Sequence, residues 1–220
     1  MLRAQKHLTK KEMKKDPFFI FIAQASEYLQ REWIKILSVI LGTVFIVVVA
    51  MLIVHFSRVS DRNAYDSTLK AYYSNAPESI DVMTQYVTKH SGSKNATKVM
   101  LQLANFYITQ KNFDAAEKFY RMGIDNSSDD QIFAFNAYNG LGAVFEERSN
   151  FEQAGKTYET FIQKFPDSAF TESMRFSAGK AYYLAGNKVS AERNFQAILD
   201  SERDSELKQE ARYYMELISS

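Results

Sequence analysis

The chain has 220 residues, a formal net charge of +1 and no cysteine. The lack of cysteine excludes disulfides, thiolate metal sites, cysteine nucleophiles and a lipid-modified bacterial N-terminus. Residues 36–220 hold 19 basic and 22 acidic side chains, and this mildly acidic balance gives no support for a nucleic-acid partner.

The first 35 residues form a basic segment, with eight Lys or Arg against four Asp or Glu and a net charge of +4. Asp16 and Pro17 have the N-cap and first-turn chemistry of a helix start. Apolar residues then recur at spacings of three and four: Phe18, Phe21, Ile22, Ala25, Leu29 and Trp33. This stripe suits an amphipathic helix at the inner membrane surface. It is also consistent with a helix that only continues into the following apolar run and binds no partner. We favour this second interpretation.

An uncharged apolar run of 19 residues follows at 36–54. As a helix it extends about 28 Å, close to the thickness of the bilayer hydrocarbon. A cleaved signal peptide would start nearer the N-terminus and end in a small-residue cleavage site. We therefore predict a transmembrane helix at 36–56. The basic flank predicts that residues 1–35 are cytoplasmic and that the chain after the span lies outside the cytoplasm. Ser38 and Gly42 form a small-x3-small pair for contact with another membrane helix.

One pattern occurs three times after residue 97. A small residue on one helix is followed, twelve positions later, by an alanine on the next helix, and aromatic residues flank both. The small residues are Ala104, Gly142 and Gly179, and the alanines are Ala116, Ala154 and Ala191. Paired antiparallel helices approach closely only where such small side chains meet. This is the tetratricopeptide pattern, and each unit leaves an apolar face for the next unit to cover.

The copies are 38 and 37 residues apart, longer than the usual repeat, and we attribute the excess to loops at 125–130 and 165–168. Turns are expected at 110–112, 148–150 and 185–187, where Asn or Gly suits chain reversal. Residues 57–96 are assigned to a linker and a degenerate helix pair broken at 75–77. Residues 97–203 are assigned to three repeats and 204–220 to a capping helix. The predicted fold is all-α, with one transmembrane helix followed by a tetratricopeptide-repeat α-solenoid.

In such arrays the first helix of each unit lines a concave groove that binds peptides or partner helices. The candidate groove residues are Lys98, Leu101, Asn105, Asn136, Asn139, Phe176, Lys180 and Tyr183. For any one of them, plain solvated surface is the commoner role. A groove that clamps a C-terminal carboxylate needs paired Lys and Asn across repeats. Gln102 and Gly140 break that pattern, so a carboxylate-clamp cochaperone is not expected.

The sequence lacks the common motifs of phosphate-binding, metal and catalytic sites. The three histidines are far apart in the sequence, and there is no Gly-rich phosphate loop, HExxH motif or Gly-x-Ser-x-Gly elbow. We therefore expect no enzyme activity, no metal, no cofactor and no small-molecule substrate.

The arrangement of tail, span and outer repeats resembles the ancillary SecYEG translocon subunit family of bacteria. The resemblance is closest at residues 94–107 and 113–118, which look like that family's first outer repeat. It implies an inner-membrane protein whose periplasmic domain acts beside the translocon, with a periplasmic chaperone, on exported chains. Residues 158–168 look more like repeats of outer-membrane assembly lipoproteins and cell-division coordinators, which lack this anchor.

Two functions follow from these observations. The first is an adaptor that contacts exported chains transiently, in protein export or chaperone delivery. The second is a structural scaffold in which the groove holds one fixed partner within an envelope or membrane complex. A receptor domain in the cytosol of a eukaryote, anchored in an organelle membrane, is a third reading, and the basic tail argues against it.

Overall fold

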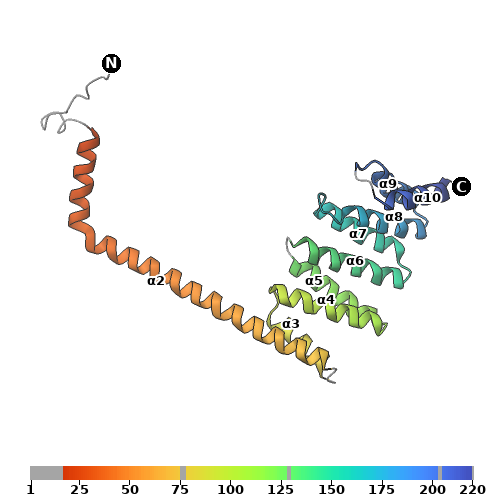
Figure 1. Cartoon of the computed structure of the whole chain (residues 1–220), viewed down its shortest axis with the longest axis horizontal. Coiled ribbons are helices and arrows are strands. Elements are labelled where there is room, and N and C mark those ends of the chain that lie inside the picture. The colour runs from red at the N-terminus through yellow and green to blue at the C-terminus, as the bar shows by residue number, and fades with distance from the viewer. Residues whose placement is uncertain (1–16, 75–77, 128–129, 203–204, 220) are drawn as a thin grey trace, which may run out of the picture. The chain divides into compact units, whose positions relative to one another are not determined.

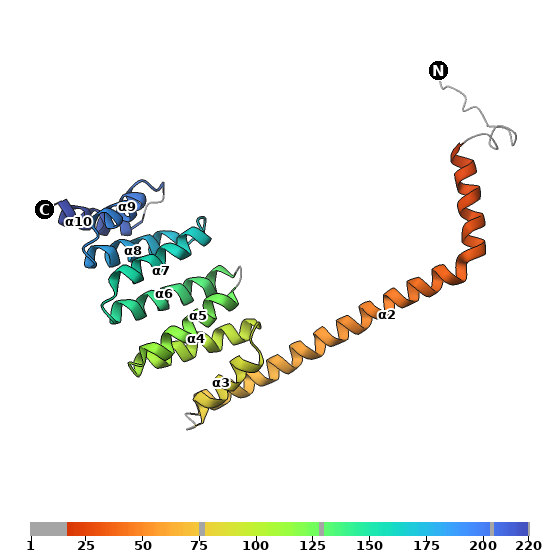
Figure 2. The same ribbon diagram turned by 180° about the vertical axis from the view of Figure 1, so that it is seen from behind.

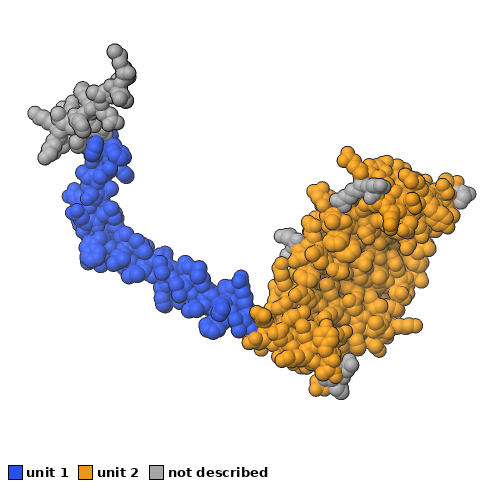
Figure 3. Space-filling view, viewed as in Figure 1, with its two compact units in different colours: residues 1–59 blue, residues 60–220 orange. Residues whose placement is uncertain are grey.

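A computed structural model describes residues 17–74, 78–127, 130–202 and 205–219. The described residues are helical or in connecting turns and contain no strand. The chain divides into two units, Met1–Val59 and Ser60–Ser220 (Figure 3). Tyr73 lies in the second unit but belongs to a helix that begins in the first. The Asp16 N-cap predicted for that helix and the predicted break at 75–77 lie outside the described residues.

That helix is α2, Pro17–Tyr73, and it is 57 residues long. It contains the predicted span and continues to Tyr73, so residues 57–60 are helical and not a linker. Every side chain from 37 to 60 is exposed within the chain. By length and composition this helix is able to cross a membrane.

In the part of the second unit that the structure describes, eight helices follow α2. They are α3 Ser79–Lys89, α4 Lys94–Thr109, α5 Phe113–Ser127, α6 Gln131–Glu147, α7 Phe151–Lys164, α8 Thr171–Leu184, α9 Lys188–Leu199 and α10 Leu207–Ser219. From α4 to α10 each packs on the next along the chain, and α4 also contacts α6 while α8 contacts α10 (Figures 1 and 2). This is the stacked solenoid that the sequence predicts.

Small residues lie at the helix crossings as the repeat pattern requires. Ala104, Ala116, Ala154 and Ala191 are fully buried. Gly142 and Gly179 face aromatic rings of the second helix in their units, Tyr158 and Phe195. In the capping helix, Ala211 and Ile218 are buried and Leu207 and Tyr214 pack on the core.

The three predicted turns share one geometry. Their central residues, Lys111, Ser149 and Gly186, have φ of 56°, 57° and 77°. The asparagine that follows each one accepts a hydrogen bond from a backbone N–H three residues on, at 3.2, 3.4 and 3.1 Å. Left-handed backbone followed by an asparagine N-cap thus reverses the chain in every unit.

Replacing Ser149 by glycine should stabilise the protein. A non-glycine residue in the left-handed region costs about 1–2 kcal/mol, and the extra unfolded-state entropy of glycine offsets part of this gain. We expect Ser149→Gly to raise the free energy of unfolding by about 0.5–1 kcal/mol. Urea unfolding of the detergent-solubilised chain, followed by circular dichroism, measures it. Ser173→Gly, at an exposed position within α8, should instead lower the free energy of unfolding.

The prediction of a polar loop at 125–130 is wrong for residues 125–127, which belong to α5. The side-chain amide of Asn126 donates to the Ser93 carbonyl oxygen at 2.9 Å and to Thr97 Oγ1 at 2.7 Å. These two bonds attach the last turn of α5 to α4. Residues 128–129 lie outside the described part of the chain, and Asp130 caps α6 by accepting from the Phe133 N–H.

A polar cluster joins α2 to the first repeat. The Asp61 carboxylate accepts from Tyr86 Oη of α3 at 2.6 Å and from Asn95 Nδ2 of α4 at 3.0 Å. His90 Nδ1 lies 3.3 Å from the same carboxylate, and its ring stacks on Tyr86. The segment of α2 around Asp61 is therefore attached to α3 and α4 by side chains that the repeat pattern did not single out.

Candidate functional site

The first helices of two neighbouring repeats enclose a groove of about 330 Å³. We call this the asparagine groove, and it is lined by Leu101, Asn105, Ile108, Tyr120, Asn136, Asn139, Gly140 and Ala143. Four of the eight predicted groove residues therefore meet in one place: Leu101, Asn105, Asn136 and Asn139. They come from α4 and α6, which pack side by side.

Tyr120 of α5 is a buried residue that also lines the groove. Its hydroxyl donates to Asn105 Oδ1 at 2.5 Å. Burial raises the pKa of Tyr120 to about 12, so the hydroxyl remains a proton donor at neutral pH. Gly140 makes room for it, because a Cβ at that position would overlap the Tyr120 ring.

The remaining predicted groove residues lie elsewhere. Lys98 is exposed, with its Nζ 5.6 Å from the centre of the Tyr65 ring of α2. Phe176 and Tyr183 are half-buried and pack edge-on against Tyr214 of α10, with ring centres 5.9 and 5.5 Å away. Lys180 stands over the Phe176 ring. The capping helix thus covers part of the surface that these residues would otherwise present.

The two membrane-contact candidates are exposed on α2. Ser38 donates its hydroxyl proton to the Lys35 carbonyl oxygen at 2.8 Å, and a Cβ added to Gly42 would meet open space beyond the backbone of its own helix. Both positions are therefore accessible to another helix, as a small-x3-small pair requires.

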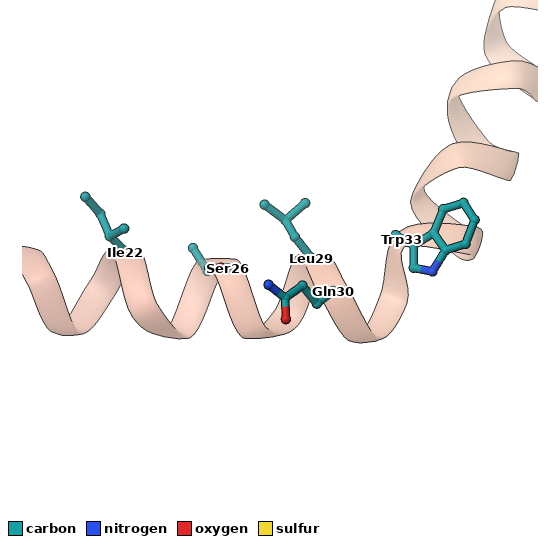
Figure 4. Close-up of a pocket in the computed structure, with 6 residues that line it drawn as sticks. Ile22, Ser26, Leu29, Gln30 and Trp33 are labelled. Atoms are coloured by element: carbon teal, nitrogen blue, oxygen red, sulfur yellow. The ribbon is translucent and has the colours of Figure 1, made fainter.

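A second hollow lies on α2 before the apolar run, where the helix bends beside Trp33 (Figure 4). It is lined by Ile22, Ala25, Ser26, Leu29, Gln30 and Trp33, so four residues of the predicted stripe share one face. Leu29 and Trp33 are more than half exposed. An interfacial position in the membrane remains a proposal for this segment.

The candidate groove residues predicted from the sequence did not include Tyr120, Ile108 or Ala143, which also line the groove. The sequence did offer a signal for Tyr120. Phenylalanine would fill the same space, and a buried tyrosine hydroxyl needs a hydrogen-bond partner. Among the described residues no group of three or more His, Asp or Glu is arranged to hold a metal ion.

One family model agrees with the repeat seen in the helix pairs. A tetratricopeptide-repeat model matches residues 140–168, which hold the last eight residues of α6 and all of α7. The human intraflagellar transport protein 88 homolog is 22% identical over 116 residues, which is 52% of this chain but only 14% of that protein.

Two crystal structures of nearly identical TPR-like repeats from a Podosopora anserina putative kinesin light chain, one of them a point variant, were also found. Each is 12% identical and covers 72% of this chain and 92% of its own, with TM-scores of 0.48 and 0.47. The repeat match and the observed helix pairs show that the described part of this chain is all-helical and contains a tetratricopeptide-type solenoid, a scaffold for protein–protein interaction.

Proposed function

We propose that the protein is a membrane-anchored adaptor that binds exported polypeptides beside the Sec translocon of the bacterial inner membrane. The observation that carries this proposal is the combination, in one chain, of an apolar helical segment with exposed side chains and a repeat array with an open groove. The protein acts by binding and not by catalysis. The proposed compartment rests on the basic N-terminal flank and on the family resemblance. The proposed place beside the translocon rests on the family resemblance.

Anchoring suits a groove of this kind. A shallow groove with a few polar groups binds many segments with modest affinity. Fixing it to the membrane raises its effective concentration where chains emerge. Exported chains and a periplasmic chaperone would meet the groove, whereas a membrane helix of the translocon or chaperone would meet Ser38 and Gly42.

The proposal predicts that the N-terminus is cytoplasmic and the C-terminus periplasmic. A reporter enzyme that is active only outside the cytoplasm should be active when fused after Ser220 and inactive when fused after Lys15. The physical reason is that basic residues next to a span are retained in the cytoplasm. The opposite pattern of activity would overturn both the orientation and the translocon proposal.

Photo-crosslinking in cells separates an adaptor from a fixed scaffold. A diazirine amino acid at Ala143, which lines the asparagine groove, should give adducts of many masses that disappear when protein synthesis is stopped. The same amino acid at exposed Gln163 is the control and should give few. At Gly42 we expect one sharp adduct with a membrane protein. A single adduct of constant mass at Ala143, unchanged when synthesis stops, would reject the adaptor in favour of the scaffold.

A further inference from the structure

We infer that residues 17–35 of α2 lie along the cytoplasmic surface of the membrane. The helix face that carries Ile22, Leu29 and Trp33 contacts lipid, and the basic side chains next to it bind anionic headgroups. The inference rests on the proposed span and its orientation, but not on what the asparagine groove binds. The sequence alone favours a helix that binds no partner here, whereas exposure, the bend in α2 and charge together favour lipid.

The apolar face of this segment is open to its surroundings. Ile22, Leu29 and Trp33 have 46%, 53% and 57% of their surface exposed. A step of two residues turns roughly 200° around a helix, so Gln24 and Arg31 lie opposite Ile22 and Leu29. A helix with large apolar side chains on one face and polar side chains on the other is typical of segments that lie in the membrane interface. Removal of such apolar surface from water is favourable.

The bend in α2 points this face toward the membrane. Beyond Trp33 the helix turns toward the side on which Ile22 and Leu29 lie (Figure 4). Close to the bend, the Ser38 hydroxyl donates to the Lys35 carbonyl oxygen at 2.8 Å, a type of bond that often accompanies bent helices. The apolar run at 36–54 begins at this bend. A bilayer entered by that run therefore lies on the same side of residues 17–35 as their apolar face.

Basic side chains next to this face match the charge of the inner leaflet. The side chains of Arg31 and Lys35 are 78% and 81% exposed, although both also pair with Glu32. The preceding residues 1–16 contain six Lys or Arg against two Asp or Glu. The cytoplasmic leaflet is anionic, and each basic residue near its surface strengthens binding about fivefold. An apolar face and a basic cluster together supply the two signals that stable attachment to a membrane surface requires.

The test uses the full-length protein, one copy in each lipid nanodisc, so that both membrane surfaces are open to reagents. Because the chain has no cysteine, a nitroxide label can be attached at one introduced cysteine. The label is placed in Ile22→Cys, on the apolar face, or in Gln24→Cys, on the opposite face. We expect the label at position 22 to collide severalfold more often with oxygen, which concentrates in lipid. We expect it to collide severalfold less often with a water-soluble nickel complex.

Substitutions in the Ile22→Cys protein separate the apolar contribution from helix propensity. In nanodiscs of phosphatidylcholine and phosphatidylglycerol, Leu29→Ser should lower the ratio of lipid-bound to water-exposed label about tenfold, because a large apolar side chain is lost from the lipid. Gln24→Ser is the matched control. It introduces the same serine on the opposite face and should change the ratio less than about twofold.

The lipid composition tests the contribution of charge. Nanodiscs of phosphatidylcholine alone should lower the same ratio at least about fivefold, because the anionic headgroups are absent. Lys14→Gln combined with Lys15→Gln should narrow the difference between the two lipid compositions. A ratio that does not depend on phosphatidylglycerol would overturn the role assigned to the basic side chains.

Equal collision rates at positions 22 and 24 would reject the surface position, because both labels would then be in water or both in lipid. If position 22 is protected from the nickel complex in native membranes but not in nanodiscs, a protein partner covers the face. Protection only in nanodiscs that hold two copies would assign the face to a second copy. A reversed pattern of reporter activity would instead overturn the proposed orientation, while the contrast between the two labels would still establish contact with lipid.

Discussion

Gly142→Ala should lower the free energy of unfolding by about 2–3 kcal/mol, near the upper end for overpacking a core. A Cβ at this position would overlap the ring of Tyr158, which is buried at the crossing of α6 and α7. The ring cannot easily move away, because Tyr158 Oη donates to Glu146 Oε1 at 2.9 Å. The overlap must therefore be relieved by separating two helices of the central repeat.

Urea unfolding of the full chain in detergent, followed by circular dichroism, measures this effect. Gly123→Ala is the matched control, because there the nearest atom to the added Cβ is the flexible Leu101 side chain at 3.2 Å. Alanine also has the higher helix propensity, worth about 1 kcal/mol, so this control should be nearly neutral. Equal losses in both variants would show that the helix crossing at Gly142 is not closely packed.

Glu159→Ala should cost about 2–4 kcal/mol, because one carboxylate holds three helices together. Glu159 of α7 accepts from Tyr182 Oη of α8 at 2.8 Å and from Asn194 Nδ2 of α9 at 2.9 Å. Arg193 donates to the same carboxylate at 2.5 Å. Tyr182 and Asn194 are both buried, so removal of Glu159 leaves polar groups without their partner.

The matched control for Glu159→Ala is Glu192→Ala, at an exposed position on α9. This control should change the free energy of unfolding by less than about 0.5 kcal/mol. If the two variants unfold at the same urea concentration, the carboxylate of Glu159 contributes no more than a surface charge. The comparison uses the same detergent-solubilised protein and the same optical signal.

The same carboxylate should make the stability depend on pH. Burial raises the pKa of Glu159, but hydrogen bonds from Asn194, Arg193 and Tyr182 outweigh burial and hold the pKa below its ordinary value of 4.5. A carboxyl with a lowered pKa stabilises the fold above about pH 4.5, and this contribution is lost as the pH falls through the lowered value. Glu159→Gln should therefore flatten the acid side of the stability profile. An unchanged profile would assign the acid sensitivity to other groups.

The sequence alone determined the repeat and its turns. The pattern has a small residue, an aromatic residue and an alanine at fixed offsets, and it places three side chains at one helix crossing. Those offsets depend only on helix periodicity within the two helices of one repeat. The turns at Lys111, Ser149 and Gly186 were also predictable, because asparagine or glycine at a chain reversal reflects local backbone preference. The apolar run in α2 needed no more than length and hydropathy.

The composition of the groove was only half predictable. Leu101, Asn105, Asn136 and Asn139 were found from the pattern because they lie on the first helices of two repeats, which line the groove. Phe176 and Tyr183 occupy equivalent helices, but α10 packs against them through Tyr214. The exposure of a groove residue thus depends on the element stacked beyond it, which the local pattern does not specify.

The tertiary structure alone decided which polar side chains meet. Asp61 reaches Tyr86 and Asn95, 25 and 34 positions along the chain, and Tyr120 reaches Asn105 from the neighbouring helix. Such contacts arise from how successive helix pairs rotate and stack. That packing depends on side chains far apart in the sequence, whereas helix periodicity and turn chemistry act between near neighbours and can be read from the sequence directly.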